Sequence, residues 1–470
     1  MSKKNEQRTD TPCPRILFAG GGSGSGKTLI TCAIMTAMQK RGLKIASYKC
    51  GPDYIDPRFH EIVVGTKAGN LDSYFMDEQT MNWQISQQSQ DADVVVLEGV
   101  MGYYDGIGSS TQGSSWDIGM KTSTPTILIF NGKGMSLTMI AQIQGILQFQ
   151  EKHTIAGIIL NQVSKATFDH LKIKLEEYCQ LPVIGYVPIL KEGILESRHL
   201  GLVMPAEIEQ LKERLEFCAN EIEATLDFDL LLTIASHAKP IVTERPVYKK
   251  LSKPLCLAVA KDEAFCFIYR ENLDFLREIG VDIRFFSPLR DKELPQGTQA
   301  LLLPGGYPEL YGEKLEQNIE MRTLIKEKIQ NGMPYLAECG GYLYLCDQLD
   351  DDHGQARKMV GIFPFHGKKQ NRLSQFGYIE LSSQQDGLMG PKGSRIRGHE
   401  FHYYQTVDKD QTLDKDQIRN GDYFLAQKPT GNKEWSCGFQ KFSGLAGFPH
   451  FSYVSNPTSA LVLFQQMIGE

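Results

Sequence analysis

The stretch Phe18-Ala-Gly-Gly-Gly-Ser-Gly-Ser-Gly-Lys-Thr28 decides the fold of the first half of this chain. Its last eight residues read G-x-x-x-x-G-K-T, the pattern of a phosphate-binding loop. Glycines such as Gly24 and Gly26 let successive backbone N–H groups converge on phosphate oxygens. Lys27 adds a positive charge, and the Thr28 hydroxyl is a ligand for Mg²⁺. The pattern predicts that the chain binds a nucleoside triphosphate.

The residues on either side of this loop support the same interpretation. Residues 15–19 form a short apolar run suited to a buried strand, and residues 29–39 have the composition of a helix. A strand, a glycine loop and a helix in this order place the phosphate at a helix N-terminus. The competing interpretation is a flexible Gly/Ser linker. It is disfavoured because linkers are not flanked by a buried strand and an alanine-rich helix.

Strand-like apolar runs alternate with helical stretches through the first half of the chain. The runs cover residues 16–19, 44–48, 93–97, 126–130, 156–160 and 183–187. Such alternation predicts parallel βαβ units, an α/β fold in which ligands bind at the carboxyl ends of the strands. The first half is therefore predicted to be a parallel-sheet domain of the P-loop NTPase type.

A segment rich in proline and charge divides the chain. Residues 239–254 are predicted to be a linker between a first domain, residues 15–238, and a second α/β domain, residues 255–470. In the second domain we expect strands at 255–260, 282–286, 300–303 and 335–337, and helices around 272–279 and 315–331. We expect residues 1–14 to be a flexible N-terminus and the polar residues 405–433 to decorate a surface.

The composition is that of an ordinary soluble protein. Of 470 residues, 41% are hydrophobic and 23% are charged, and the net charge of -6 offers no support for nucleic-acid binding. The start of the chain is polar and there is no run of about 18 apolar residues, so we expect no membrane segment and a cytoplasmic protein. The ten cysteines are scattered without a C-x-x-C pair, which indicates buried thiols rather than disulfides or a zinc site.

Charged residues follow the second predicted strand. The loop Tyr48-Lys-Cys-Gly-Pro-Asp-Tyr-Ile-Asp-Pro-Arg-Phe-His60 contains Lys49, Asp53 and Asp56. We expect Lys49 to neutralise phosphate charge and one of the two aspartates to join Thr28 on the metal. The alternative is a turn that uses Asp and Pro only for its backbone geometry.

Further polar residues follow the third and fifth predicted strands. Glu98 ends the apolar strand in Asp93-Val-Val-Val-Leu-Glu98, where phosphate-loop enzymes place a second metal contact. Asp105 lies in the glycine-rich loop beyond and is a candidate for metal, phosphate or substrate. Asn161 is placed to hydrogen-bond a base edge or to cap a turn.

Four motifs together carry a resemblance to a known family. They are Lys49-Cys-Gly-Pro-Asp-Tyr-Ile-Asp-Pro57, Asn70-Leu-Asp72, Glu98-Gly-Val-Met-Gly102 and Arg198-His-Leu-Gly-Leu-Val203. They resemble the cobyrinic acid a,c-diamide synthases, an amidoligase family related to dethiobiotin synthetase. By that resemblance residues 24–28 hold ATP, Glu98 and an aspartate such as Asp53 bind Mg²⁺, and Asn161 touches adenine. Asp56 and Asp105 are then assigned to substrate or phosphate.

The second half contains a cysteine at a turn with the features of a nucleophile. A glycine pair follows a buried strand in Leu301-Leu-Leu-Pro-Gly-Gly-Tyr-Pro-Glu309. Cys339 lies at a strand-to-helix corner, which we call the elbow, in Pro334-Tyr-Leu-Ala-Glu-Cys-Gly-Gly-Tyr342. A thiol there is exposed and lies near helix N–H groups, which lower its pKa and supply an oxyanion hole. We interpret Cys339 as the nucleophile and Gly306 and Gly340 as the N–H donors. The alternative is an inert packing thiol.

A cysteine nucleophile needs a base, and two segments offer one. Gly447-Phe-Pro-His-Phe-Ser-Tyr453 presents His450, whereas Gly398-His-Glu-Phe-His402 presents two histidines in a spacing that differs from the H-E-x-x-H of zinc proteases. The order of glycine pair, elbow cysteine and late histidine resembles class I glutamine amidotransferases, which assigns His450 as the base. That family has a glutamate two residues after its histidine, where this chain has Ser452, so the third member is left unassigned.

Together the two halves predict an ATP-dependent carbon–nitrogen ligase. A carboxylate is activated as an acyl phosphate in the first half, and Cys339 releases ammonia from L-glutamine in the second. The resemblance implies a tetrapyrrole substrate, the corrinoid cobyrinic acid, amidated on its a and c carboxylates in cobalamin biosynthesis, and a homodimer. Hydrogenobyrinic acid and nickel-sirohydrochlorin are alternative substrates. A regulatory P-loop ATPase without glutaminase activity is the alternative of a different class.

Overall fold

The computed structural model describes residues 9–11, 13–190, 205–408 and 421–470. The chain divides into two compact units, Met1–Pro246 and Val247–Glu470. The division after Pro246 lies within the segment 239–254 that the sequence predicts to be a linker. Among the helices that the structure describes, none is long and apolar enough to cross a membrane.

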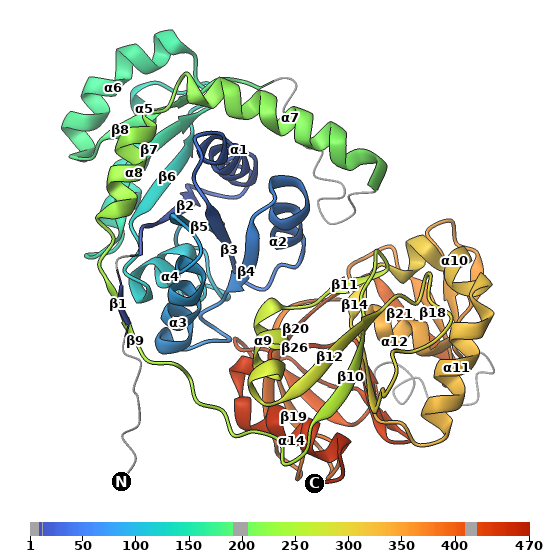
Figure 1. The fold of residues 1–470 in the computed structure, drawn as a ribbon. Helices are drawn as coiled ribbons and strands as arrows, with labels where there is room; N and C mark the ends of the chain where they lie inside the picture. The colour runs from blue at the N-terminus through green and yellow to red at the C-terminus, as the bar shows by residue number, and fades with distance from the viewer. Residues whose placement is uncertain (1–8, 12, 191–204, 409–420) are drawn as a thin grey trace, which may run out of the picture. The chain divides into compact units, whose positions relative to one another are not determined.

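The first unit is built on a seven-stranded sheet in which all neighbouring strands are parallel (Figure 1). The strand order is β4-β3-β5-β2-β6-β7-β8. The strands are β2 Arg15–Gly20, β3 Ile45–Cys50, β4 Lys67–Leu71, β5 Val94–Gly102, β6 Thr126–Asn131, β7 Ile155–Asn161 and β8 Val183–Val187. The predicted parallel α/β fold is confirmed. The edge strand β4 was missed because its five residues include only one large apolar side chain, Leu71.

Helices cover both faces of this sheet. They are α1 Lys27–Lys40, α2 Ile55–Phe59, α3 Glu78–Ser89, α4 Ser115–Lys121, α5 Leu137–Gln148, α6 Lys165–Cys179, α7 Pro205–Glu223 and α8 Phe228–Ser236. Successive residues of a strand face opposite sides of the sheet. In β6, Ile127 and Ile129 pack with α1, α7 and α8, whereas Leu128 and Phe130 pack with α5 and α6. Burial on both faces explains why the sequence shows continuous apolar runs instead of alternation.

The strand order puts the phosphate-binding loop at the middle of the sheet. β2 leads into the loop and lies between β5 and β6, and the chain runs outward to β3 and β4 before it returns to β5. Ligands bind at such points of reversal, at the carboxyl ends of the strands. The register places Lys49 of β3 level with Glu98 of β5, so both residues lie at this edge.

Two short strands of the first unit lie outside the main sheet. β1 Thr9–Thr11 pairs antiparallel with β9 Ile241–Thr243. β1 falls within the N-terminal residues expected to be flexible, and β9 falls within the expected linker, so the structure differs from both expectations at these residues. A strand of three residues is too short to produce a readable alternation in the sequence.

The second unit has a six-stranded sheet of order β12-β10-β13-β15-β25-β24, parallel except for the β24–β25 pair. Its strands are β10 Leu255–Ala260, β12 Val281–Phe286, β13 Ala300–Leu303, β15 Tyr335–Glu338, β24 Phe439–Lys441 and β25 Gly444–Gly447. Its helices are α9 Arg270–Glu278, α10 Gly312–Gln317, α11 Ile319–Gln330, α12 Gly340–Leu345 and α14 Pro457–Met467. The single helix expected at 315–331 is two, because the Asn318 side chain accepts a bond from Met321 N and caps α11.

Smaller sheets complete the second unit. The five-stranded sheet has the order β23-β22-β19-β20-β26, the four-stranded sheet has the order β17-β16-β18-β21, and β11 pairs with β14. Their strands are β11 Phe265–Phe267, β14 Gly305–Gly306, β16 Cys346–Asp350, β17 Ala356–Lys358, β18 Phe363–Lys369, β19 Gln375–Ser383, β20 Arg395–His402, β21 Tyr404–Asp408, β22 Phe424–Gln427, β23 Glu434–Cys437 and β26 His450–Phe451. The segment 405–433, expected to decorate a surface, thus contributes to two sheets, and buried Phe424 and Ala426 belong to the core.

Candidate active site

The phosphate-binding loop runs from the end of β2 into α1. Gly26 caps α1 with a left-handed backbone, φ 85°, a conformation that favours glycine. A Cβ at Gly26 would collide with the Asn161 amide, whose nitrogen donates to the Ser25 carbonyl at 2.8 Å. Lys27 Nζ donates to the Met101 carbonyl at 2.7 Å. Asn161 thus braces the loop in this structure, and its contact with adenine stays a prediction.

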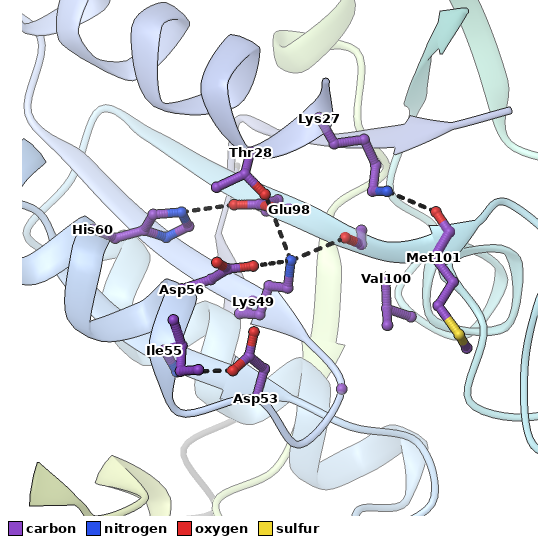
Figure 2. Close-up of polar contacts among 12 residues, drawn as sticks. Lys27, Thr28, Lys49, Asp53, Ile55, Asp56, His60, Glu98, Val100 and Met101 are labelled. Atoms are coloured by element: carbon purple, nitrogen blue, oxygen red, sulfur yellow. Dashed lines mark hydrogen bonds and ion pairs between the residues drawn. The ribbon is translucent and has the colours of Figure 1, made fainter. Parts of the chain in front are cut away.

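Glu98 is the centre of a buried polar cluster (Figure 2). Its Oε1 accepts hydrogen bonds from Thr28 Oγ1 at 2.5 Å and from Lys49 Nζ at 2.8 Å. Its Oε2 lies 2.8 Å from His60 Nε2, and Lys49 also forms an ion pair with Asp56. Glu98 and His60 are fully buried. Side chains from α1, β3 and the helical turns after β3 therefore meet at one carboxylate of β5.

The charges of this cluster balance each other. Burial alone would lower the pKa of Lys49, but the carboxylates of Asp56 and Glu98 hold it well above its ordinary value. Burial would raise the pKa of Glu98, but Lys49 and the hydrogen bond with His60 hold it below its ordinary value. Burial raises the pKa of Asp56 against the opposing effect of Lys49. Glu98 is therefore the ionised partner of a protonated Lys49.

The donor atoms around Glu98 fit Mg²⁺. The Thr28 hydroxyl and the Glu98 carboxylate are in contact, and Asp56 is bound to the same lysine. Such hard oxygen ligands are those that Mg²⁺ prefers. Asp53 makes a local contact instead, because its Oδ1 accepts from Ile55 N at 2.8 Å. The structure therefore brings Asp56 closer to the expected metal position than Asp53, and the assignment of Asp53 to the metal stays a prediction.

Asp105 lies in a turn beyond β5. Its Oδ2 accepts from Gly102 N at 2.9 Å, which is the role of a turn-closing side chain. Burial lowers the pKa of Lys27, and the charges of Glu98, Asp56 and Asp105 oppose that effect. Asp105 therefore adds to the negative charge around Lys27.

Cys339 lies at the turn between β15 and α12. Its backbone angles, φ 47° and ψ -104°, are uncommon for a residue with a side chain. Cys339 N donates to the Gly447 carbonyl at 2.7 Å, which ties the turn to β25. A Cβ at Gly341 would collide with the Leu303 carbonyl, so only glycine allows the helix to start this close to β13. A strained strand-to-helix turn of this kind presents a nucleophile.

The glycine pair of β14 borders two other parts of this site. A Cβ at Gly305 would collide with the His450 ring, and a Cβ at Gly340 would lie 3.0 Å from Gly306 N. Gly306 and Gly340 are therefore adjacent, as two N–H donors of one oxyanion hole need to be. The His450 ring lies against the same glycine pair.

Three buried histidines gather near this turn. β26 pairs with β20 so that His450 lies opposite His399, and their rings stack with centroids 4.9 Å apart. His402 Nδ1 donates to the Tyr404 carbonyl at 2.7 Å, whereas His402 Nε2 lies 3.6 Å from Glu400, which is longer than a hydrogen bond. The geometry favours His450 as the base, because its ring borders the glycine pair that also borders the elbow.

Burial sets the resting protonation of this site. It raises the pKa of the Cys339 thiol, an effect that the Glu309 charge increases and the Gly340 N–H opposes. Burial also lowers the pKa of His450 well below its ordinary value. The resting pair is a neutral thiol and a neutral imidazole. This corrects the expectation that the thiol is exposed and has a lowered pKa.

Family models match both units of the chain. Residues 16–200 match the CobQ/CobB/MinD/ParA nucleotide binding domain, and residues 256–446 match the CobB/CobQ-like glutamine amidotransferase domain. The cobyrinate a,c-diamide synthase of Streptococcus sanguinis is 38% identical over 444 residues, which cover 93% of this chain and 96% of the relative. The chain belongs to the cobyrinate a,c-diamide synthase family. Members from Clostridium tetani and Listeria monocytogenes are 37% identical and cover 94% and 97% of this chain, and 97% and 99% of the relatives.

The sequence did not predict a role in the two sites for two buried side chains of this cobyrinate a,c-diamide synthase family member, His60 and Glu338. His60 begins a π-helical turn, a feature that is frequent at functional sites, and its ring lies with Cys32 and Glu98 in a group whose ligand atoms are within 4.8 Å of one another. Glu338 has its Oε2 3.8 Å from His450 Nδ1. The available signal for Glu338 was an apolar strand that ends in an acid, as for Glu98. The family motif at residues 198–203 lies outside the described residues.

Proposed function

We propose that this chain catalyses the ATP- and glutamine-dependent amidation of the a and c carboxylates of cobyrinic acid, a corrinoid, in cobalamin biosynthesis. The observation that carries the proposal is the presence, in one chain, of a phosphate loop in contact with Glu98 and of a glycine pair, Gly305 and Gly306, that borders both the His450 ring and Gly340 of the Cys339 elbow. The names of the relatives supply the substrate. They do not favour hydrogenobyrinic acid, nickel-sirohydrochlorin or a regulatory ATPase.

In the first unit, ATP is held with its γ-phosphate toward a substrate carboxylate. A carboxylate oxygen attacks the γ-phosphorus, the bond to the β,γ-bridging oxygen breaks, and ADP leaves an acyl phosphate behind. Lys27 and Lys49 stabilise the charge on the transferred phosphoryl group. Thr28 and Glu98 would hold Mg²⁺, which neutralises phosphate charge when bound.

In the second unit, the side-chain amide of glutamine is the substrate. His450 takes the Cys339 thiol proton as the sulfur attacks the amide carbon, and the oxyanion lies against the N–H groups of Gly306 and Gly340. The carbon–nitrogen bond breaks, the proton on His450 goes to the nitrogen, and ammonia leaves. Water then attacks the thioester with His450 as base, which releases glutamate and restores the thiol.

Ammonia connects the two reactions. It attacks the carbonyl carbon of the acyl phosphate, inorganic phosphate leaves, and the nitrogen loses a proton, so that the carboxylate has become a primary amide. A free carboxylate resists this attack because its carbonyl is electron-rich and its oxygen is a poor leaving group. The same sequence at the second carboxylate completes the a,c-diamide.

The substrate assignment is tested by offering three macrocycles to the same enzyme. The enzyme is incubated with ATP, Mg²⁺ and glutamine and, in separate reactions, with cobyrinic acid, hydrogenobyrinic acid or nickel-sirohydrochlorin. The masses of the products are measured by mass spectrometry. We expect conversion of cobyrinic acid to its diamide. Conversion of only hydrogenobyrinic acid or only nickel-sirohydrochlorin would show that this macrocycle, and not cobyrinic acid, is the substrate. ATP hydrolysis without glutamine turnover or amide formation would favour the regulatory ATPase.

A cytoplasmic location and a homodimeric assembly complete the proposal, and the homodimer rests on the resemblance alone. Light scattering coupled to gel filtration tests the assembly, with an expected mass twice the 52.8 kDa of one chain. A mass of one chain at the concentration of the activity assay would exclude the dimer.

A further inference from the structure

Two buried glutamates of the second unit each lie beside a histidine. Glu338 Oε2 is 3.8 Å from His450 Nδ1, and Glu400 Oε2 is 3.6 Å from His402 Nε2. No side chain of the two pairs is more than 6% exposed. Because the pairs are alike in distance and burial, their surroundings decide which of them serves the reaction.

The pair Glu400–His402 is committed to packing. His402 Nδ1 lies 2.7 Å from the Tyr404 carbonyl, so this nitrogen carries a proton and donates it. The ring stacks on Phe448 with centroids 3.9 Å apart and planes 7° from parallel. The hydrogen bond of Nδ1 and the stacked ring face therefore hold His402 in place against its neighbours.

The pair Glu338–His450 lies at the elbow itself. Glu338 is the last residue of β15 and directly precedes Cys339, whose N–H is bound to Gly447 of β25. His450 lies three residues after Gly447 in the chain and is held in place because its strand β26 pairs with β20. Strand pairing therefore fixes both partners relative to the same turn. Since Nδ1 is on the side of Glu338, we assign Nε2 to the thiol proton.

We propose that Glu338 is the positioning residue of His450. It takes the part that class I amidotransferases give to a glutamate two residues after the histidine, where this chain has Ser452. Its carboxyl group fixes the orientation of the ring and, in its ionised form, stabilises the imidazolium that forms when the Cys339 proton arrives. The inference rests on the glutaminase half of the proposed function.

Because Glu338 and His450 are both buried, each stabilises the charged form of the other. An isolated imidazolium or carboxylate in this site costs several kcal/mol of desolvation, and an ion pair offsets part of that cost. In accordance with this, burial lowers the pKa of His450 and raises that of Glu338 to about 8. The separation of 3.8 Å is longer than a hydrogen bond. Such contacts are often long before the substrate binds, and a shift of about 1 Å closes this one.

Glutamine hydrolysis by three variants of the full chain tests the inference. Glu338→Gln keeps the side-chain volume and removes the carboxylate, so kcat should fall at least about tenfold while KM changes less than about twofold. Glu338→Asp restores a carboxylate on a shorter side chain and should recover part of kcat. Glu400→Gln is the matched control, since it removes a carboxylate from the other pair, and should keep kcat within about threefold.

Two further readouts separate positioning from folding. Amidation with ammonium as nitrogen source bypasses Cys339, so Glu338→Gln should retain it at the wild-type rate. Alkylation of Cys339 by iodoacetamide, followed by peptide mass mapping, should slow in Glu338→Gln, with the buried Cys346 as the reference thiol.

The outcomes that overturn the inference are distinct from those that overturn the proposed function. If the wild-type protein hydrolyses glutamine and Glu338→Gln does so with unchanged kcat, only the inference fails. Equal loss in Glu400→Gln, or loss of ammonium-dependent amidation in Glu338→Gln, would show that Glu338 acts through the fold. A wild-type protein that releases no ammonia from glutamine would overturn the proposed function and the inference with it.

Discussion

Lys49 Nζ lies 2.8 Å from Glu98 Oε1 and pairs with Asp56 as well, and all three side chains are buried. One ammonium group is therefore the counter-charge for two carboxylates at the edge of the sheet where the phosphate loop ends. The charge of Lys49 holds the two carboxylates together, and the proposed function gives the same charge a second role, the stabilisation of the transferred phosphoryl group.

Replacing Lys49 by Met should destabilise the first unit and stop amidation. Two buried carboxylates would then face each other without a counter-charge, at a cost of about 3–5 kcal/mol. Urea unfolding measures the stability, and amide formation with ammonium measures the chemistry. Glutamine hydrolysis at Cys339 should persist.

The control for that variant is Lys67→Met on the neighbouring strand β4. Lys67 forms a half-exposed ion pair with Asp91 at 3.7 Å, so its loss should change stability by less than about 1 kcal/mol. Equal stability of the Lys49→Met and Lys67→Met proteins would contradict the role given to Lys49.

His60→Ala should weaken the use of Mg²⁺. The imidazole holds Glu98 Oε2 at 2.8 Å, and loss of such a supporting contact typically lowers metal affinity about 10–100-fold. The measurement is the Mg²⁺ concentration that gives half-maximal ADP formation in the presence of macrocycle and ammonium. His170→Ala, an exposed position on α6, is the control and should leave that concentration unchanged. A His60→Ala enzyme with the Mg²⁺ dependence of the wild type would argue against this role.

The contribution of Glu338 to the stability of the second unit should fall as the pH rises. Burial raises the pKa of Glu338 from 4.5 to about 8, so the folded chain binds this proton more tightly than the unfolded chain. The resulting stabilisation is complete below the unfolded pKa of 4.5 and is lost as the pH rises through about 8.

Comparison with Glu338→Gln isolates this contribution, because glutamine stays neutral throughout. The free energy of unfolding of the wild type should fall relative to that of the variant by up to about 1.4 kcal/mol per pH unit between pH 5 and 8. Urea unfolding at several pH values measures the difference. Parallel curves for the two proteins would show that Glu338 is not a buried, protonated acid in the folded chain.

The sequence located residues of the first unit that the structure brings together, because parallel strands place their carboxyl ends at one edge. Lys49 and Glu98 were each inferred from a polar residue at the end of an apolar run, and the sheet register brings them level. Asp53 and Asp56 share one loop, so spacing alone did not separate the residue that contacts Lys49 from the one that closes a turn. His60 was missed because a π-helical turn has no readable sequence signal.

The second site depended more on pairing between distant segments. The elbow at Cys339 was visible as a strand followed by two glycines, but the expected lowered thiol pKa neglected burial. Glu338 was missed because its partner comes from β26, a strand of two residues that β20 positions. Strands β21 and β22 were missed for a similar reason, since their segment is polar apart from a few inward-facing residues.

Transfer of the glutamine nitrogen to the corrinoid tests the central claim most directly. Cobyrinic acid, ATP, Mg²⁺ and glutamine labelled with nitrogen-15 in its side-chain amide are incubated with the wild-type protein and with Cys339→Ser. We expect the wild type to form a diamide with label at both new amides, and Cys339→Ser to form it only when ammonium is supplied. A wild-type protein that hydrolyses ATP but leaves the macrocycle without labelled nitrogen would contradict the claim.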